Sequence, residues 1–316
     1  MRLVKLFSTV DQFKQPLDVK GAVSLSGDLL KRYQSFLLEI AKDIIDVCEK
    51  EDVAYHLTGG SALGAVRHGG FIPWDDDIDI DILGSDFERF EKAFLAAHSD
   101  KYWLHTYKKH NYGILVSRVR LKNTVFRARE DFDNDECGFF VDLIRIENTF
   151  DNPILRFMHG MDCMGMGFLL SCRNYFHNRR HILPMAGNNK KLVAVLKVKI
   201  FIGRLVSFRS LDKWAEKTQR CYSRCKNNRS EYVSVPAGRR HYFGEMYRRA
   251  DFVESRKACF EGHMWNVPRD CDGYLKSMYG DYMKLPTPEE REAHVILELK
   301  FPNEGGDGCV NQIREG

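Results

Sequence analysis

The spacing of apolar positions divides the first seventy residues into helical and extended segments. Over residues 28–51, apolar side chains recur three or four positions apart, which predicts a helix with one core-facing side. A short apolar run at 53–57 predicts a strand, and the small residues at 58–61 form a turn after it. Residues 62–67 have the character of the first turns of a helix. This order of elements is typical of a mixed α/β protein.

The rest of the chain changes from mixed to mainly helical spacing. Apolar and acidic residues alternate over residues 74–82, the pattern of a strand with one apolar face, and helical spacing returns at 85–98. From 153 to about 228 the spacing is helical again, and shorter strands with a helix at 271–279 complete the chain. Strand-like runs before the long helices occupy 102–107, 112–121, 124–129 and 139–146.

These elements predict an α/β (α+β) fold in two parts. We expect residues 1–150 to form the catalytic core, with a mixed sheet and flanking helices. Residues 151–302 are expected to form a mainly helical subdomain that closes on this core and shapes the substrate cleft. The polar, Gly-rich residues 303–316 are expected to be a loose tail.

Composition restricts the choice of partners and compartment. The chain has 316 residues, of which 44% are apolar and 29% charged, the balance of a globular protein. A net charge of +4 is too small to indicate nucleic acid, so no nucleic-acid partner is expected. Nine cysteines without regular spacing suggest reduced thiols in a cytosol-like compartment. Cys221 and Cys225 form a pair, but no second pair stands at zinc-ligand spacing.

Two features bear on membrane contact. Residues 1–14 are interrupted by polar side chains before a signal-length apolar stretch develops. The most apolar segments, 154–170 and 192–208, both contain charged residues that are costly in hydrocarbon. We therefore expect a cytoplasmic protein without a membrane span. The second segment has apolar and basic sides that allow peripheral contact at the inner face of a membrane, although a core helix is the alternative.

The alternating segment at 74–82 carries the clearest chemical signal. In a strand, Asp75, Asp77, Asp79 and Asp81 point to one side, with same-side neighbours ~7 Å apart. Such a row of anions is unfavourable without cations, and carboxylate oxygens suit Mg²⁺ or Mn²⁺, which take further ligands from phosphates. Asp142 lies in an apolar strand-like run and is the best-placed third carboxylate for a two-ion site.

Other interpretations of the acidic residues remain open. Asp76 and Asp81 are also interpreted as solvated or salt-bridged side chains. An EF-hand is a sharper rival, because Asp77, Asp79 and Asp81 stand at its first, third and fifth places. The EF-hand fails at the sixth place, where Ile82 replaces the glycine that the loop requires. The alternation with isoleucine favours a strand.

Small and basic residues just before this segment are candidates for phosphate binding. Backbone N–H groups at Gly59 and Gly60 and the Ser61 hydroxyl can hold phosphate oxygens at a strand-to-helix turn. Arg67 and His68 follow on the same segment, and we favour Arg67 as functional. Further basic residues share one side of a predicted strand or lie just beyond it, and together they could neutralise a diphosphate. For each one taken singly, a solvated strand face is the preferred interpretation. These residues are Arg118, Arg120, Lys122, Arg127 and Arg129.

The motifs around these residues resemble the LicD family. Residues 59–68 and 71–80 closely resemble its defining segment, and 139–143 is similar to its second acidic strand. The stretches 260–262 and 274–286 resemble its C-terminal segment. The family includes the fukutin-related ribitol phosphate transferases and belongs to the polymerase-beta-like nucleotidyltransferase superfamily. The resemblance therefore implies a nucleotidyltransferase core with a mixed sheet.

The resemblance also implies site residues and cofactors. Asp77 and Asp79 correspond to the paired metal ligands, and Asp142 to a third carboxylate that binds metal or accepts a proton. The cofactor would be Mg²⁺ or Mn²⁺, with two ions expected. Asp81 stands where a small residue is more usual in the family, so a pair shifted to Asp79 and Asp81 stays open. Glu261 belongs to the matching C-terminal segment and is taken as a substrate-side residue.

By the same resemblance, the chain would be a phosphotransferase. It would move a phosphoryl-linked alcohol, phosphocholine first, from a CDP-activated donor such as CDP-choline to a hydroxyl of a cell-surface glycan or its precursor, releasing CMP. Trp74 can contact a quaternary amine by a cation–π interaction, although core packing is its alternative role. Two other functions stay open: attachment of NMP to a small molecule, and divalent-metal or carbohydrate binding without catalysis.

Overall fold

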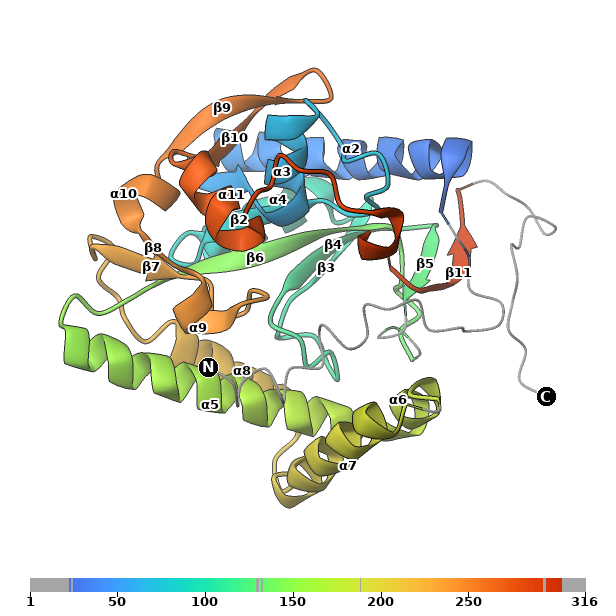
Figure 1. The fold of residues 1–316 in the computed structure, drawn as a ribbon, viewed down its shortest axis with the longest axis vertical. Coiled ribbons are helices and arrows are strands. Elements are labelled where there is room, and N and C mark those ends of the chain that lie inside the picture. The colour runs from blue at the N-terminus through green and yellow to red at the C-terminus, as the bar shows by residue number, and fades with distance from the viewer. Residues whose placement is uncertain are drawn as a thin grey trace.

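A computed structural model describes residues 23, 25–128, 131, 133–187, 189–291 and 294–302. The expectations for residues 1–14 and for the tail at 303–316 fall outside these residues. Helices and strands alternate through the first half, and helices dominate the middle (Figure 1). The helices are α2 (Gly27–Lys50), α3 (Gly59–Arg67), α4 (Phe87–His98), α5 (Pro153–His177), α6 (Arg179–Met185), α7 (Lys190–Leu205), α8 (Leu211–Tyr222), α9 (His241–Gly244), α10 (Arg249–Phe252), α11 (Cys271–Tyr279) and the 3-10 helix η1 (Pro288–Glu290).

A mixed sheet forms the centre of the molecule, in the strand order β1-β2-β6-β4-β3. β2 and β6 run parallel side by side, and the remaining neighbours in this row are antiparallel. The predicted mixed sheet is therefore confirmed. The strands are β1 (Tyr55–Leu57), β2 (Asp79–Leu83), β3 (Tyr102–His105), β4 (Ser117–Leu121), β5 (Val125–Ala128), β6 (Phe140–Asn148), β7 (Tyr232–Ser234), β8 (Met246–Arg248), β9 (Ser255–Phe260), β10 (His263–Pro268) and β11 (Ile296–Lys300).

The main apolar core lies between this sheet and the helices α2 and α4. The apolar side of α2 includes Leu37, Ile40 and Ile44, all fully buried, as the spacing of the sequence predicts. The isoleucines of β2, Ile80 and Ile82, belong to the same core cluster. Burial of these side chains removes apolar surface from water and fixes the position of β2. The acidic residues of β2 are thereby attached to the main apolar core.

The last third of the chain returns to this core. β7 pairs with the end of β6, and β11 pairs with β5. The β9–β10 hairpin packs against α3 and β1, while α11 packs against α3 (Figure 1). Residues 151–302 are consequently helical only in their first part, and the boundary at residue 151 remains a prediction about domains. This return brings side chains from residues 240–300 close to the acidic segment.

The helices predicted between residues 153 and 228 form a second layer below the sheet in Figure 1. The long helix α5 packs against both α7 and α8. Asn152 caps α5 by accepting hydrogen bonds from the N–H groups of Ile154 and Leu155. A second apolar cluster, separate from the main core, lies between α5 and α8. Among the described residues, no helix combines the length and apolarity that a bilayer crossing needs.

Candidate active site

The acidic residues lie on a loop and on the first part of β2. The strand begins at Asp79, so the prediction of one strand over residues 74–82 is wrong for its first half. The N–H of Asp75 donates to the carbonyl of Ile72 in a turn that contains Pro73, which ends the extended path. Asp75 and Asp77 therefore approach the site from a loop. The same strand excludes the EF-hand, because Asp79 and Asp81 are already paired in a sheet.

Asp79 and Asp142 are direct neighbours across the parallel pair β2–β6. Their Cα atoms are register partners, and the N–H of Asp142 donates to the carbonyl of Ile78 at 3.0 Å. The two predicted carboxylates thus come together from strands that lie about sixty residues apart in the chain. Asp77 adds electrostatic repulsion to both Asp79 and Asp142, which places it within the same cluster.

Arg118 is a site residue that the sequence interpretation assigned to a solvated face. On the antiparallel pair β4–β6, Arg118 stands opposite Asp142, and its Nε donates to Oδ1 of Asp142 at 2.7 Å. Arg120 is also buried, and its Nη2 donates to both carboxylate oxygens of Asp131. The solvated interpretation is therefore wrong for both arginines. The pairing of β4 with β6 brings Arg118 opposite Asp142. Local sequence patterns do not indicate which strands pair.

The small-residue segment forms the beginning of α3 and touches the carboxylates. Gly59 has φ +53°, and a Cβ atom there would lie 2.9 Å from Oδ2 of Asp79. A Cβ atom on Gly60 would lie 2.7 Å from Oδ2 of Asp75. Only glycine lets the helix N-terminus approach the carboxylates this closely. The positive end of the helix dipole thus lies beside an anionic cluster.

The Ser61 hydroxyl and the Gly59 N–H already have partners. Oγ of Ser61 accepts a hydrogen bond from the N–H of Asp79 at 2.9 Å, which ties α3 to β2. The N–H of Gly59 donates to the hydroxyl of Tyr274 at 2.9 Å, and Thr58 contacts the same hydroxyl at 2.7 Å. Tyr274, on α11, is a positioning residue to which the sequence assigned no role. Its only signal was its place in the C-terminal stretch that resembles the family.

Arg67 and His68 lie at the other end of α3. Nη1 of Arg67 donates to the carbonyl of Tyr282 at 2.6 Å, and Asp75 attracts the same guanidinium. Desolvation lowers the pKa of Arg67 although this acidic neighbour opposes the shift. His68 is exposed, and its ring lies edge-on to Trp74 at 6.5 Å. Arg67 therefore holds the C-terminal segment and remains next to the acidic cluster.

Trp74 and Glu261 have structural contacts of their own. The guanidinium carbon of Arg291 lies 4.1 Å from the ring centroid of Trp74, so this aromatic face already contacts a cation. Oε1 of Glu261 accepts a hydrogen bond from the N–H of Phe71 at 3.0 Å. Glu261 thereby fixes the loop that leads from α3 into the acidic segment. Its role as a substrate-side residue stays a prediction.

The cluster carries more negative charge than its surroundings neutralise. Burial, together with repulsion from Asp77 and Asp76, raises the pKa of Asp75 well above its usual range. Burial raises the pKa of Asp77 to about 6, and burial with repulsion from Asp77 and Asp142 raises that of Asp79. Each of these carboxylates is stabilised in its charged form if a cation arrives. The cluster therefore has the electrostatics of a cation site.

Asp76 has a defined partner that the sequence did not predict. Its two carboxylate oxygens accept from the backbone N–H and contact Nδ1 of His294, both at 2.9 Å. Burial raises the pKa of Asp76, but the charge and hydrogen bonds of His294 outweigh it, so the pKa is lowered. Of the two interpretations of Asp76, the salt-bridged one is confirmed and the solvated one is wrong. Ligand atoms of Asp76, Asp77 and His294 lie within 4.8 Å of one another, a grouping able to hold an ion.

Asp81 is buried on β2, two residues beyond Asp79. Its side chain is 1% exposed, so the solvated interpretation is wrong here as well. Neither carboxylate oxygen has a hydrogen-bond partner among the described residues, and Nδ1 of His56 lies 4.0 Å from Oδ2. Burial raises the pKa of Asp81 well above its usual range. The alternative metal pair of Asp79 and Asp81 stays open.

The donor set fits hard divalent cations. Carboxylate oxygens from Asp75, Asp77 and Asp79 converge beside a helix N-terminus, and Asp142 lies in register with Asp79. Oxygen ligands of this kind suit Mg²⁺ or Mn²⁺, and the adjacent N–H groups suit phosphate oxygens. The arrangement can therefore hold a metal–phosphate group between α3, the loop before β2, and β6.

Comparisons with known proteins agree with this geometry. Residues 52–151 match the family model described as LicD/FKTN/FKRP, nucleotidyltransferase domain, which covers α3, β2 and β6. The lipopolysaccharide cholinephosphotransferase LicD of Haemophilus influenzae is 24% identical over 288 residues, 85% of this chain and 97% of that protein. The ribitol 5-phosphate transferases FKRP of Homo sapiens and Mus musculus are 46% identical over 56 residues, 18% of this chain and 11% of each protein.

The matched region contains the residues around which the site is built, from Gly59 to Asp142, and the named relatives are transferases. The resemblance to the LicD family is therefore confirmed, and the chain carries a LicD-family domain over residues 52–151.

Proposed function

We propose that the protein transfers a phosphoryl-linked alcohol, phosphocholine first, from a CDP-linked donor to a hydroxyl of a glycan, with release of CMP. One observation carries this proposal: carboxylates of Asp77, Asp79 and Asp142 gather beside the glycine-rich start of α3. A diphosphate needs cations on one side and N–H donors on the other, and this is where the chain offers both. The relative that matches most of the chain is named a lipopolysaccharide cholinephosphotransferase.

Asp77, Asp79 and Asp142 would hold Mg²⁺ or Mn²⁺, with two ions as the working assumption. When bound, these ions neutralise charge on the diphosphate and on the departing CMP. Arg118 donates to Oδ1 of Asp142 at 2.7 Å and so fixes the orientation of this carboxylate next to Asp79. Asp76 and His294 have ligand atoms within 4.8 Å of Asp77 and would add to the same ion site.

The residues of the chain itself position the donor. The first turn of α3 lies beside Asp75 and Asp79, and its N–H groups, other than that of Gly59, would donate to phosphate oxygens. Ser61 and Tyr274 fix this turn relative to β2 and α11. The sheet order, with two acidic strands adjacent and a glycine turn before them, supports a nucleotidyltransferase core.

The head group of the donor depends on the environment of Trp74. A quaternary amine that used this ring face would have to replace the guanidinium of Arg291, which lies 4.1 Å from the ring centroid. A ribitol or glycerol head group would leave that contact in place. CMP release from choline, ribitol and glycerol donors is therefore compared between the wild type and Arg291→Ala. A change with the choline donor alone would indicate that its quaternary amine uses the ring of Trp74.

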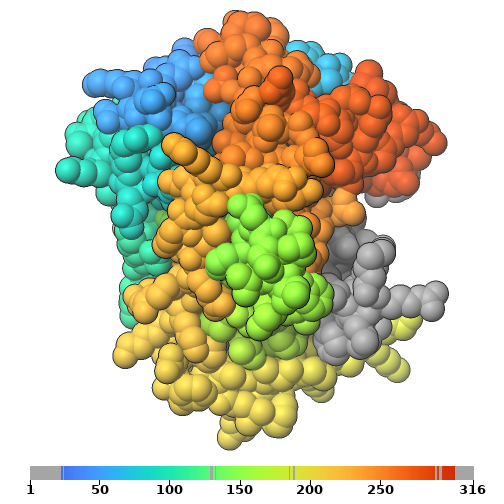
Figure 2. Space-filling view, turned by 90° about the vertical axis from the view of Figure 1, so that its left-hand side faces the viewer, coloured from blue at the N-terminus to red at the C-terminus, as the bar shows by residue number. Residues whose placement is uncertain are grey.

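A peripheral contact with a membrane surface, where glycan precursors are lipid-linked, is a further part of the proposal. The helices α5 and α7 of the second layer expose apolar side chains. Figure 2 shows the beginning of α5, in green, at the molecular surface. Exposed basic residues on α7, such as Lys191, Lys197 and Arg204, suit anionic lipids. The exposed apolar residues are Ile154, Leu155, Phe157, Met158, Met161, Val198, Phe201 and Leu205. In a flotation experiment with anionic vesicles, the wild type should float with the vesicles. The double variant Phe201→Ser/Leu205→Ser should stay in the bottom fraction.

The decisive test is release of CMP from each donor. Purified protein is incubated with Mg²⁺ and CDP-choline, CDP-ribitol or CDP-glycerol, together with a range of glycan acceptors. We expect release with one donor, dependent on the divalent ion and on Asp79. Asp46→Asn, an exposed carboxylate on α2, serves as the matched control. Absence of release from all three donors would overturn the proposal.

A further inference from the structure

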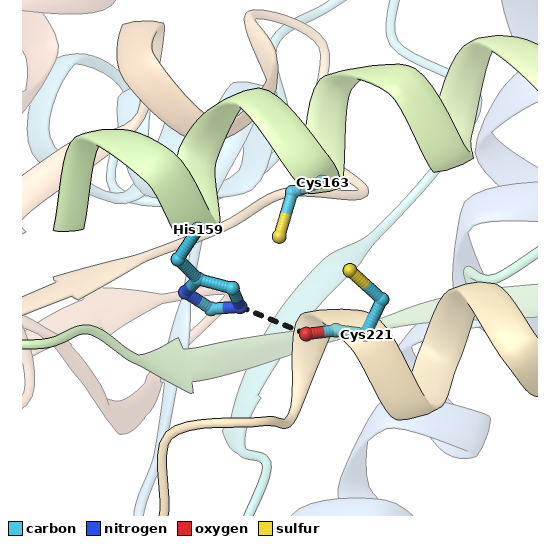
Figure 3. Close-up of side chains that lie close together, drawn as sticks. All are labelled: His159, Cys163 and Cys221. Carbon is cyan, nitrogen blue, oxygen red and sulfur yellow. Dashed lines mark hydrogen bonds between the residues drawn. The ribbon is translucent and has the colours of Figure 1, made fainter. Parts of the chain in front are cut away.

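A second cluster of potential ligands lies between α5 and α8, apart from the acidic residues. His159 and Cys163 belong to α5, and Cys221 belongs to the last turn of α8. One ligand atom from each residue lies within 4.8 Å of the others, and all three side chains are buried. Figure 3 shows the imidazole and the two sulfur atoms directed into the space between the helices.

The local structure explains this convergence. His159 and Cys163 are four positions apart on one helix, so both side chains lie on the same side of α5. α8 packs against that side and contributes Cys221. The cluster thus belongs to the apolar core between the two helices, which includes Cys163, Cys221 and Tyr242. Residues far apart in the chain are held in place by helices that pack independently of the cluster.

The polar contacts here exceed what cysteines acting as small apolar side chains require. Nε2 of His159 contacts the carbonyl oxygen of Cys221 at 2.8 Å, and Nδ1 faces the hydroxyl of Tyr242 at 3.4 Å. Nη2 of Arg224 lies 3.5 Å from Sγ of Cys221. The two sulfur atoms and the imidazole nitrogen therefore lie close together within an apolar core.

We propose that His159, Cys163 and Cys221 form a structural zinc site that joins α5 to α8. One imidazole nitrogen and two sulfur atoms are ligands that Zn²⁺ prefers over Mg²⁺. Binding releases the two thiol protons to solvent, so that the two thiolates balance the charge of the ion. Nε2 of His159 exchanges its contact with the Cys221 carbonyl for the ion. The ring proton moves to Nδ1 and donates to Tyr242, as in other histidine–metal sites.

The fourth coordination position is filled by water or by Cys225. Cys225 is buried and follows Cys221 by four residues, but its thiol donates to the carbonyl of Thr149 at 3.2 Å. Closed structural sites use four protein ligands. To join such a set, Cys225 would have to give up its hydrogen bond to Thr149. Loss of zinc in Cys225→Ala would add this residue to the site and support the proposal.

The test is the zinc content of the whole chain after gel filtration in a buffer with Mg²⁺. We expect about one zinc per chain in the wild type, and its loss in Cys163→Ala and Cys221→Ala. Cys172→Ala is the matched control, because Cys172 is a buried thiol on the same helix outside the cluster. Asp79→Asn should retain zinc, which separates this site from the acidic residues. Equal zinc in all variants would overturn the proposal.

A second measurement protects the test against variants that fail to fold. Wild-type protein stripped by a chelator is titrated with Co²⁺, which gives thiolate-to-cobalt absorption only when sulfur atoms bind the ion. This absorption should appear at one equivalent and vanish when Zn²⁺ is added. Its absence in refolded, reduced wild type, or a Cys163–Cys221 disulfide in the protein as purified, would contradict the zinc site.

Discussion

The two ligand clusters of the molecule offer different kinds of ligand atom. The acidic cluster lies where the inner strands β2 and β6 of the mixed sheet begin, and it offers hard oxygen atoms from Asp77, Asp79 and Asp142. The helical cluster offers one nitrogen and two sulfur atoms from α5 and α8. The acidic cluster contains excess charge that burial makes unfavourable, whereas thiols and a neutral imidazole are tolerated in an apolar core.

This difference separates the tasks that the clusters can perform. Unneutralised carboxylates beside a helix N-terminus attract a cation together with a phosphate, and such a site exchanges its ligands during turnover. Thiols buried between two helices suit an ion that stays bound and stabilises the fold. The comparison therefore predicts that activity depends on the first cluster and stability on the second.

The substitution with the largest expected effect, Asp79→Asn, separates the role of the acidic cluster from that of the helical cluster. Asp79→Asn keeps the side-chain shape but removes a charge from the centre of the acidic cluster, and should lower CMP release about 10²- to 10³-fold. Its zinc content and unfolding temperature should stay close to the wild type. Stopped assays of CMP with Asp46→Asn as the control measure this. Wild-type activity in Asp79→Asn would move the metal pair away from Asp79.

Glu147 is a buried carboxylate between the sheet and the helical layer, and it makes the stability of the fold depend on pH. It lies on β6 and accepts from Nε2 of Gln219 on α8, and burial raises its pKa from 4.5 to about 7. Its contribution to stability is therefore present below pH 4.5 and is lost as the pH rises through 7.

Glu147→Gln should remove this dependence. The unfolding free energy of the wild type, relative to the variant, should fall by roughly 2–3 kcal/mol between pH 4.5 and pH 8. Urea unfolding at several pH values measures the difference, and Glu245, which burial also shifts, cancels between the two proteins. Parallel curves for wild type and variant would show that Glu147 stays charged on folding.

Removal of zinc should affect stability more than activity. Free zinc at 100 times its dissociation constant stabilises the folded chain by about 2.7 kcal/mol. A zinc chelator should therefore lower the unfolding temperature of the wild type and of Cys172→Ala, and leave Cys163→Ala unchanged. Thermal unfolding with and without chelator measures this. An equal decrease in all three proteins would point to another zinc ligand set.

The smallest effect concerns the geometry of the acidic cluster. Gly60→Ala places a Cβ atom 2.7 Å from Oδ2 of Asp75, so this carboxylate or the turn must move. We expect about a tenfold loss of CMP release, because small displacements at a reacting centre are costly. Gly165→Ala on α5, where a Cβ atom meets nothing within 4 Å, is the control. Equal activity in both variants would mean that Asp75 moves freely.

Much of the fold followed from local patterns. The helix predicted over residues 271–279 has the bounds of α11, and the helix over 28–51 differs from α2 by one residue at each end. Both have a regular apolar side, which the packing of a helix against a core requires. The strand over residues 74–82 was too long, because alternation continues through a turn around Pro73. Periodicity describes which side is apolar and does not state where hydrogen bonding begins.

The site was predicted in its acidic members and missed in its partners. Asp77, Asp79 and Asp142 were chosen because several carboxylates next to apolar strand positions need a cation. Arg118, His294 and Tyr274 were missed, since each reaches the site through a pairing of distant segments. An arginine on a strand has the same local pattern whether it is solvated or opposite an aspartate.

The sequence by itself determined which ligand groups are available: a row of carboxylates, a glycine-rich turn before it, and scattered thiols and histidines. Only the tertiary structure decided which of these meet. Strand pairing brought Asp142 and Arg118 to Asp79, and helix packing brought Cys221 to His159 and Cys163. The reason is physical: side-chain type fixes what a residue can bind, whereas non-local burial fixes its neighbours.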